Sequence, residues 1–149
     1  MDASQVPGIG DLLGDAGALP EIEYGGRVWK IGKPTQRAGD CLVQLTIRAA
    51  MREIQALKGV VDDADYRAMF DDFTVSVQTG AYKTWGDRWS AMAAGMDGTV
   101  RFLLSLLRER HPDATEADAM SLMVNCGDEV KAAFAQVLPP FLFLLLDHH

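Results

Sequence analysis

The sequence is poor in the residues that catalysis and metal binding usually need. Its 149 residues include two cysteines and three histidines. Neither Cys41 nor Cys126 has a second cysteine or a histidine at metal-ligand spacing, so we expect two buried free thiols and a reducing, cytoplasmic compartment. His111 precedes a proline at an expected helix end, and His148 and His149 end the chain. These positions favour a helix-capping residue and a terminal tail over catalytic histidines.

Positive charge is scarce too. The 14 lysines and arginines against 21 acidic residues give a formal net charge of -7, which opposes binding to a phosphate backbone, so no nucleic-acid partner is expected. No apolar run approaches the roughly 20 residues that cross a bilayer, and the start of the chain lacks the pattern of a signal peptide. We therefore expect a protein that is neither secreted nor inserted in a membrane.

Fingerprints of enzymes and cofactors are missing as well. The glycines at positions 8–14 superficially resemble a phosphate-binding loop, but no strand precedes them and no Gly-Lys-Ser/Thr follows. The acidic doublets at 62–63 and 71–72 are typical of a helix cap and a solvated helix face, because the calcium-loop pattern is absent. We predict no catalytic residue, no cofactor and no metal, and interpret the chain as an interaction protein and not an enzyme.

What is present predicts a folded, mainly α protein. Hydrophobic residues make up 48% of the chain and charged residues 23%, which is typical of a globular domain. Glycine and proline in residues 1–20 indicate a flexible arm. Residues 21–138 predict a domain in which a β-hairpin precedes a compact bundle of about five or six helices. Residues 139–149 form a hydrophobic C-terminal tail.

The β-hairpin is predicted from two alternating runs around Gly25-Gly26, which supplies the positive φ that a two-residue turn needs. The register that follows pairs Glu21 with Lys30, Ile22 with Trp29, and Tyr24 with Arg27. One face then carries Ile22, Tyr24, Trp29 and Ile31. An isolated hairpin is marginal in water, so we expect this face to pack on the next helix or on a neighbouring subunit.

Apolar residues at helical spacing follow the hairpin. A first helix is expected from Pro34-Thr35 to the residues before Gly59, and a second, capped by Asp62-Asp63, has a stripe of Tyr66, Met69, Phe70, Phe73 and Val77. The third and fourth stripes comprise Tyr82, Trp85, Trp89, Met92 and Met96, and then Val100, Leu103, Leu104 and Leu107. Asp97-Gly98 is expected to separate them. Thr115 precedes a fifth helix with Ala117, Met120, Val124 and Cys126 on its stripe, and a sixth is expected over 129–137.

Aromatic residues on three of these segments are the candidate partner-binding residues, since tryptophan and tyrosine are enriched in binding hot spots. They are Tyr24, Trp29, Tyr82, Trp85, Trp89, Phe141 and Phe143. For Trp85 and its neighbours, core packing is the alternative. The apolar run 141–146 either contacts a partner, folds back on the domain, or is not the natural end of every product.

The order of parts in the sequence is a hairpin with Gly25-Gly26, a helix start at Pro34-Thr35, an acidic helical body, and Arg110-His-Pro-Asp-Ala-Thr-Glu116 before paired short helices. This order resembles that of the tail assembly chaperones of long-tailed, siphovirus-like bacteriophages. The resemblance covers Leu19 to Leu138. It implies a protein of the host bacterial cytoplasm that binds and solubilises the tape-measure protein, helps to recruit tail-tube subunits and leaves before the virion matures. Members of that family are often also made as a longer, frameshifted product.

Two alternatives stay open. One is a structural virion protein, such as a head-tail connector or decoration protein, and the other is a small phage-encoded protein that binds a host factor. The chaperone and structural interpretations both predict self-association. They differ in whether the protein remains in the mature virion, because a chaperone should be missing from purified particles.

Overall fold

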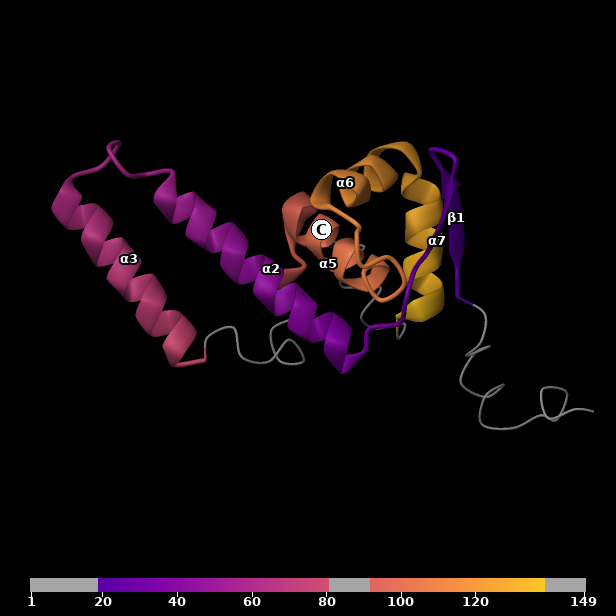
Figure 1. The fold of residues 1–149 in the computed structure, drawn as a ribbon, viewed down its shortest axis with the longest axis horizontal. Coiled ribbons are helices and arrows are strands. Elements are labelled where there is room, and N and C mark those ends of the chain that lie inside the picture. The colour runs from indigo at the N-terminus through magenta and orange to yellow at the C-terminus, as the bar shows by residue number, and fades with distance from the viewer. Residues whose placement is uncertain (1–18, 81–91, 139–149) are drawn as a thin grey trace, which may run out of the picture.

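The computed structural model describes residues 19–80 and 92–138. Within these ranges the chain is mainly helical, with one two-stranded antiparallel sheet followed by five helices (Figure 1). The predicted fold class, an N-terminal β-hairpin followed by a helical bundle, is confirmed. The predicted arm, except for its last two residues, and the predicted C-terminal tail lie outside the described residues.

The β-hairpin consists of β1 (Glu21–Tyr24) and β2 (Arg27–Lys30), and its register agrees with the prediction at every pair. Gly25 and Gly26 have φ angles of 64° and 77°, the combination that a type I′ turn requires. Ile22 and Trp29 are buried. The predicted apolar face therefore packs within the chain, where β1 contacts α7.

The helix α2 (Gln36–Gln55) links two parts of the molecule. It begins at Thr35, whose Oγ1 accepts a hydrogen bond from the Ala38 N–H at 3.1 Å, the N-cap geometry that serine and threonine favour. Its buried residues all lie between Ala38 and Leu45, on the half that packs against α5. The second half extends away from the β-hairpin and α7 and lies beside α3 (Figure 1), and its Arg52 still reaches Glu116 of α6.

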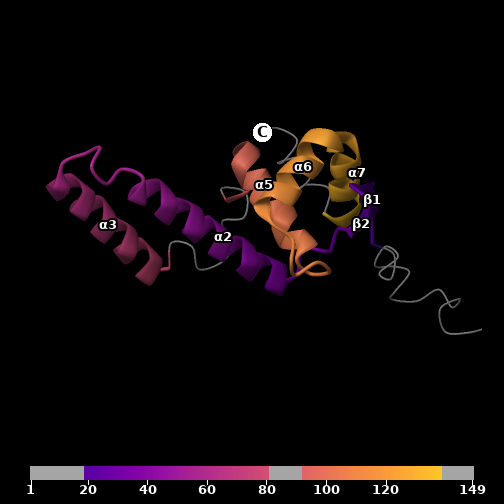
Figure 2. The same ribbon diagram turned by 45° about the horizontal axis from the view of Figure 1, so that its top comes forward.

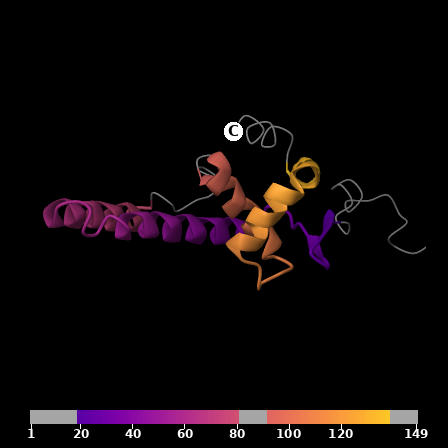
Figure 3. The ribbon, with the colours of Figure 1, turned by 90° about the horizontal axis from the view of Figure 1, so that it is seen from above.

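The helix α3 (Asp63–Gln78) turns back and packs along α2. We call α2 and α3 together the helical hairpin. On α3 only Phe73 is buried, and it lies in the predicted stripe with Tyr66 and Phe70, which are half-buried. Seen from above, both helices extend from the rest of the molecule in one direction (Figure 3).

The remaining elements form the body of the molecule (Figure 2). The central helix α5 (Gly95–Leu107) is buried from Phe102 to Leu107 and packs against α2 and α6. The helix α6 (Glu116–Asn125) begins with a capping box, in which the Thr115 hydroxyl accepts from the Asp118 N–H and the Asp118 carboxylate accepts from the Thr115 N–H. The helix α7 (Gly127–Val137) packs against α6 and β1.

Two helix predictions are wrong in detail. Asp97-Gly98 does not separate two helices, because α5 already begins at Gly95 and Asp97 lies in its first turn. Gly98 is needed inside that helix, since a Cβ there would come within 2.6 Å of the Met92 carbonyl oxygen.

The predicted stripe of the fifth helix is the second error. Met120 and Val124 are 37% and 68% exposed, whereas Ala119 and Leu122 are fully buried. Two stripes of α6 fit the helical period, and packing against α5 buries the one that carries Leu122. Both cysteines are free; Cys126 is buried as predicted, and Cys41 is half-buried.

Candidate interaction surfaces

The helical hairpin is the part of the described molecule that the core covers least. Its exposed large apolar residues are Val60, Met69 and Val75, which are 75%, 36% and 54% exposed. The carboxylates of Asp71 and Asp72 are also exposed and form no ion pair within the described residues. Val60 lies in the loop between the two helices and Met69 and Val75 lie on α3, while the body also exposes large apolar side chains at Val28, Met96, Met120 and Val124.

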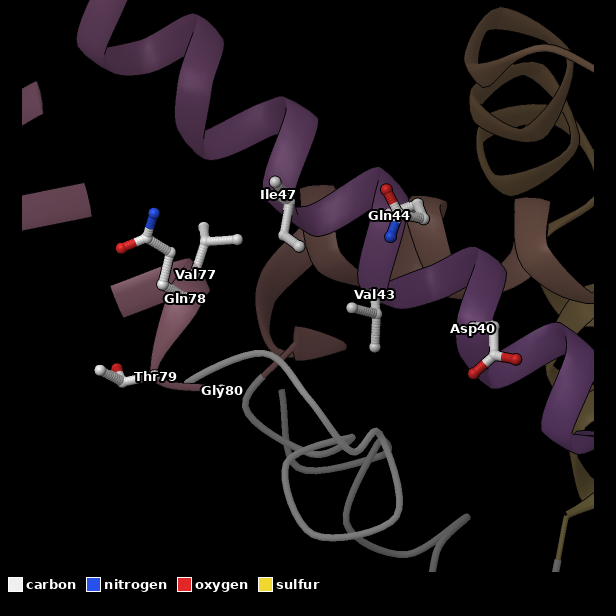
Figure 4. A pocket seen from close by; sticks show the side chains of 8 residues that line it. All are labelled: Asp40, Val43, Gln44, Ile47, Val77, Gln78, Thr79 and Gly80. Carbon is white, nitrogen blue, oxygen red and sulfur yellow. The ribbon is translucent and has the colours of Figure 1, made fainter. Parts of the chain in front are cut away.

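A hollow of about 430 Å³, which we call the hairpin pocket, opens where the end of α3 meets the middle of α2 (Figure 4). It is lined by Asp40, Val43, Gln44, Ile47, Val77, Gln78, Thr79 and Gly80. Three of these, Val43, Ile47 and Val77, are apolar and come from both helices, while the polar ones include exposed Gln44 and Gln78. Apolar side chains with a few polar groups are the usual lining of a ligand or peptide pocket.

A second hollow, the junction groove, has a volume of about 380 Å³ and lies between α2, α5 and α6. It is lined by Ala49, Arg52, Glu53, Ala56, Asp97, Val100, Arg101, Glu116 and Met120. Arg52 donates to Glu116 across it, with Nη2 at 3.2 Å from Oε1. The Nε of Arg101 is buried and has no hydrogen-bond partner in the part of the chain that the structure describes. A buried donor without an acceptor costs about 1–3 kcal/mol, and this donor stays unpaired although the carboxylates of Glu53, Asp97 and Glu116 line the same groove.

A third cluster, the clasp, ties the β-hairpin to the loop after α5. Both terminal nitrogens of Arg27 donate to the Asp113 carboxylate, at 3.2 and 3.0 Å. The Lys30 backbone N–H donates to Nε2 of His111 at 2.9 Å. The Arg27 guanidinium stacks 4.1 Å from the centre of the Trp29 ring, which lies 5.1 Å from the His111 ring. Arg27 and His111 thus lie against the Trp29 ring and also hold β2 in place.

The clasp requires a neutral imidazole. Nε2 of His111 accepts from Lys30, and Nδ1 lies 3.0 Å from Nη2 of Arg27, itself a donor. A neutral ring has one N–H, so only one of the two nitrogens can accept; a protonated ring would place an N–H against both donors. Burial, and next the nearby charge of Arg27, lower the pKa of His111 below 6.5. Hydrogen bonding to Arg27 lowers the pKa of Asp113 in turn.

The structure describes two of the seven predicted partner-binding residues. Trp29 is 5% exposed and belongs to the core. Tyr24 packs against that core, and its hydroxyl accepts from Nδ2 of Asn125 at 3.0 Å. Contact of Trp29 with a partner would require the β-hairpin to leave the body. The other five, Tyr82, Trp85, Trp89, Phe141 and Phe143, lie outside the described residues.

Sequence reasoning missed both hollows. The sequence predicts Val77 on an apolar stripe, but a stripe does not reveal that two helices diverge and leave a pocket between them. Arg101 gave no signal, because its lack of a partner depends on tertiary packing. The breadth of the apolar arc on α2 was a usable signal, since one side packs on α5 and another on α3.

Within residues 19–80 and 92–138, no group of three or more histidine, cysteine, aspartate or glutamate side chains is arranged to hold a metal ion. None of the helices in these ranges is both long enough and apolar enough to cross a membrane. Comparison with known proteins found no matching family model, curated protein or solved structure.

Proposed function

We propose that this chain is a phage tail assembly chaperone, which binds and solubilises the tape-measure protein and helps to recruit tail-tube subunits. The observation that carries the proposal is the helical hairpin, which extends from the body and has a pocket of mixed polar and apolar lining between its two helices. In this proposal the pocket receives apolar side chains of a long client helix.

The chemistry of the hairpin pocket suits such a client. A long amphipathic helix exposes apolar residues that aggregate unless another protein covers them. Val43, Ile47 and Val77 supply apolar contacts in the pocket, and Gln44 and Gln78 can hydrogen-bond to polar groups beside them. A formal net charge of -7 favours a soluble complex. We propose the tape-measure protein as the client because the order of parts in the sequence resembles tail assembly chaperones.

The test is co-expression with the tape-measure and tail-tube proteins of the same genome. We expect each to become soluble and to co-purify with this chain, and we expect the chain to be missing from purified virions. Stoichiometric copies in virions, with no binding to either client, would replace the proposal by the structural alternative. Absence from virions together with no client binding would favour the host-factor alternative.

A pocket variant makes this test specific. Val77→Ser changes a half-buried pocket residue, and Val124→Ser makes the same change at an exposed position on α6. We expect Val77→Ser to reduce client recovery severalfold and Val124→Ser to leave it unchanged. Equal recovery with both variants would place the client elsewhere on the protein.

A further inference from the structure

We infer that the hairpin pocket selects its client by charge. It takes a stretch of amphipathic helix in which a lysine or arginine lies one turn away from apolar residues, and Asp40 is the residue that binds the positive charge. This inference deepens the function proposed above and rests on it for the identity of the client. It is carried by the charge of the pocket lining, the fixed position of the Asp40 carboxylate, and the apolar surface beside it.

The lining of the hairpin pocket has an unbalanced negative charge. Among the eight described residues that line it, Asp40 is the one that carries a charge at neutral pH. Asp40 is exposed, and none of the ion pairs in the described part of the chain includes it. The nearest arginine along α2, Arg37, lines a different hollow together with Cys41. A cation brought by a partner would therefore meet a carboxylate that has no cation yet.

The carboxylate of Asp40 is held in place by its own helix. Nε2 of Gln36 donates to Oδ1 of Asp40 at 2.9 Å, which leaves Oδ2 to accept from a partner. Figure 4 shows this carboxylate at the end of the pocket away from α3, on the same side of α2 as Val43. A hydrogen bond from a lysine or arginine to a carboxylate is charge-assisted and is stronger than one between neutral groups.

The spacing of the lining residues defines the pattern that a client helix needs. Four of them share one stripe of α2, because they are spaced i, i+3, i+4 and i+7; they are Asp40, Val43, Gln44 and Ile47. The stripe extends about 10 Å along the helix axis, which corresponds to about two turns of a client helix. The aliphatic part of a lysine or arginine can pack on Val43 while its charged end reaches Asp40. Apolar residues three or four and seven positions away then face Ile47 and Val77.

The pocket also disfavours the wrong client. A helix that covers the pocket removes water from the Asp40 carboxylate, and a charged group that loses water without gaining a partner costs free energy. An apolar or acidic side chain at this place is therefore disfavoured, whereas a cation compensates the loss. Gln44 and Gln78 can donate as well as accept, so they do not discriminate between charges. The net charge of -7 attracts any basic partner from a distance, and the test must separate that effect from Asp40.

The test uses three synthetic peptides of about 18 residues, long enough to form an amphipathic helix. They have the same apolar pattern and differ at one position, three residues before the first apolar one, which is lysine, glutamine or glutamate. Fluorescence anisotropy measures the Kd of each peptide for the full chain. We expect the lysine peptide to bind about 10-fold more tightly than the glutamate peptide, with the glutamine peptide between them. The difference should shrink as salt is added.

Variants of the chain assign this preference to one residue. Asp40→Asn keeps the shape of the side chain and removes its charge, so the preference for lysine over glutamate should fall to about threefold or less. Asp128→Asn makes the same change in net charge at an exposed position on α7 and should leave the preference unchanged. Asp40→Lys should invert it, so that the glutamate peptide binds more tightly. Circular dichroism checks that each variant is folded, and the Asp40→Asn result stands if the Lys variant is not.

Three results would overturn the inference. The wild-type chain could bind none of the peptides, or it could bind all three equally. The third result is an equal loss of preference in Asp40→Asn and Asp128→Asn, which would indicate an effect of net charge alone.

These results are distinct from failure of the proposed function. If the peptides bind equally but Val77→Ser still reduces recovery of the tape-measure protein, the client site stands and selection by charge does not. If Asp40 discriminates between the peptides but the tape-measure protein does not bind, the selectivity of the pocket is supported and the proposed client is wrong.

Discussion

The helical hairpin has the longer helices, with 20 and 16 residues, but α5, the shorter central helix of the body, is buried more completely. In the body, α5 is buried at every position from Phe102 to Leu107. In the helical hairpin, α3 has 16 residues, of which one, Phe73, is buried. Because burial of apolar surface is the main stabilising contribution in folding, the body is stabilised by its own core, whereas α3 relies on one side of α2.

This contrast distinguishes helices that stabilise the fold from helices whose surface is available to a partner. A helical segment buried on all sides, such as Phe102 to Leu107 of α5, has no surface left for a partner. A helix covered on one side, such as α3, keeps a free face but has a lower free energy of local opening. The proposed client site uses the helical hairpin for this reason. Mutations that distinguish the two regions test the contrast.

The largest effect is expected for Leu103→Ala in the body. Leu103 is fully buried, so the change removes buried methyl groups and leaves a cavity, which lowers the free energy of unfolding by about 2–5 kcal/mol. Met69→Ala in the helical hairpin, at a site that is 36% exposed, should lower it by less than about 1 kcal/mol. Urea denaturation followed by circular dichroism measures both. Equal losses would mean that α3 is packed as well as α5.

A smaller loss is expected for Gly98→Ala. The added Cβ would lie 2.6 Å from the Met92 carbonyl oxygen and 2.7 Å from the Ala93 carbonyl carbon. Backbone atoms must move to admit it, at about 1–3 kcal/mol. Gly127→Ala is the matched control, since a Cβ there meets nothing within 4 Å and alanine restricts the unfolded chain, which should be neutral or slightly stabilising. Thermal melts measure the difference. The melting temperature should fall for Gly98→Ala and should stay unchanged or rise slightly for Gly127→Ala.

A pH-dependent effect is expected from the clasp. The pKa of His111 is lowered in the folded chain, so below about pH 6.5 the unfolded chain binds more protons than the folded one. The contribution of His111 to stability is fully present above that pH and is lost as the pH falls through the lowered pKa. The charged groups that face the ring are Arg27, Lys30 and Asp113.

His111→Gln isolates that contribution. Glutamine can accept from the Lys30 N–H but does not titrate. The unfolding free energy of the variant should therefore depend less on pH between 5 and 7 than that of the wild type. Parallel denaturation series at several pH values measure the difference. Identical pH slopes for the two proteins would show that protonation of His111 does not weaken the clasp.

Local patterns predicted the β-hairpin and most helix starts, because the responsible residues act on their immediate neighbours. Gly25-Gly26 set the turn and therefore the register, and Thr35 and Thr115 cap the helices that follow them. Errors arose where distant contacts decide. Gly98 looks like a helix breaker but permits a close backbone approach. Likewise, Leu122 rather than Met120 is buried because α6 docks on α5.

The candidate surfaces depend on contacts between residues far apart in the sequence even more than the helix boundaries do. Pattern placed Trp29 on an apolar face but could not decide between the core and a partner, and the chain itself buries this residue. Arg101 is distinctive only because no acceptor comes near its Nε in the folded chain. A sequence records which side chains can hydrogen-bond, whereas packing determines which of them find a partner.

The smallest effect is expected for Val75→Ser on α3. Val75 is 54% exposed, so at concentrations where the chain is monomeric the change should alter global stability by less than about 0.5 kcal/mol. Hydrogen exchange should nevertheless separate the two regions, because α3 can open without unfolding the body. Amides of α3 should exchange through low-energy local opening, and those of α5 only through global unfolding. Equal protection of both helices would mean that the helical hairpin and the body unfold as one unit, and its exposed face would then be as rigid as the core.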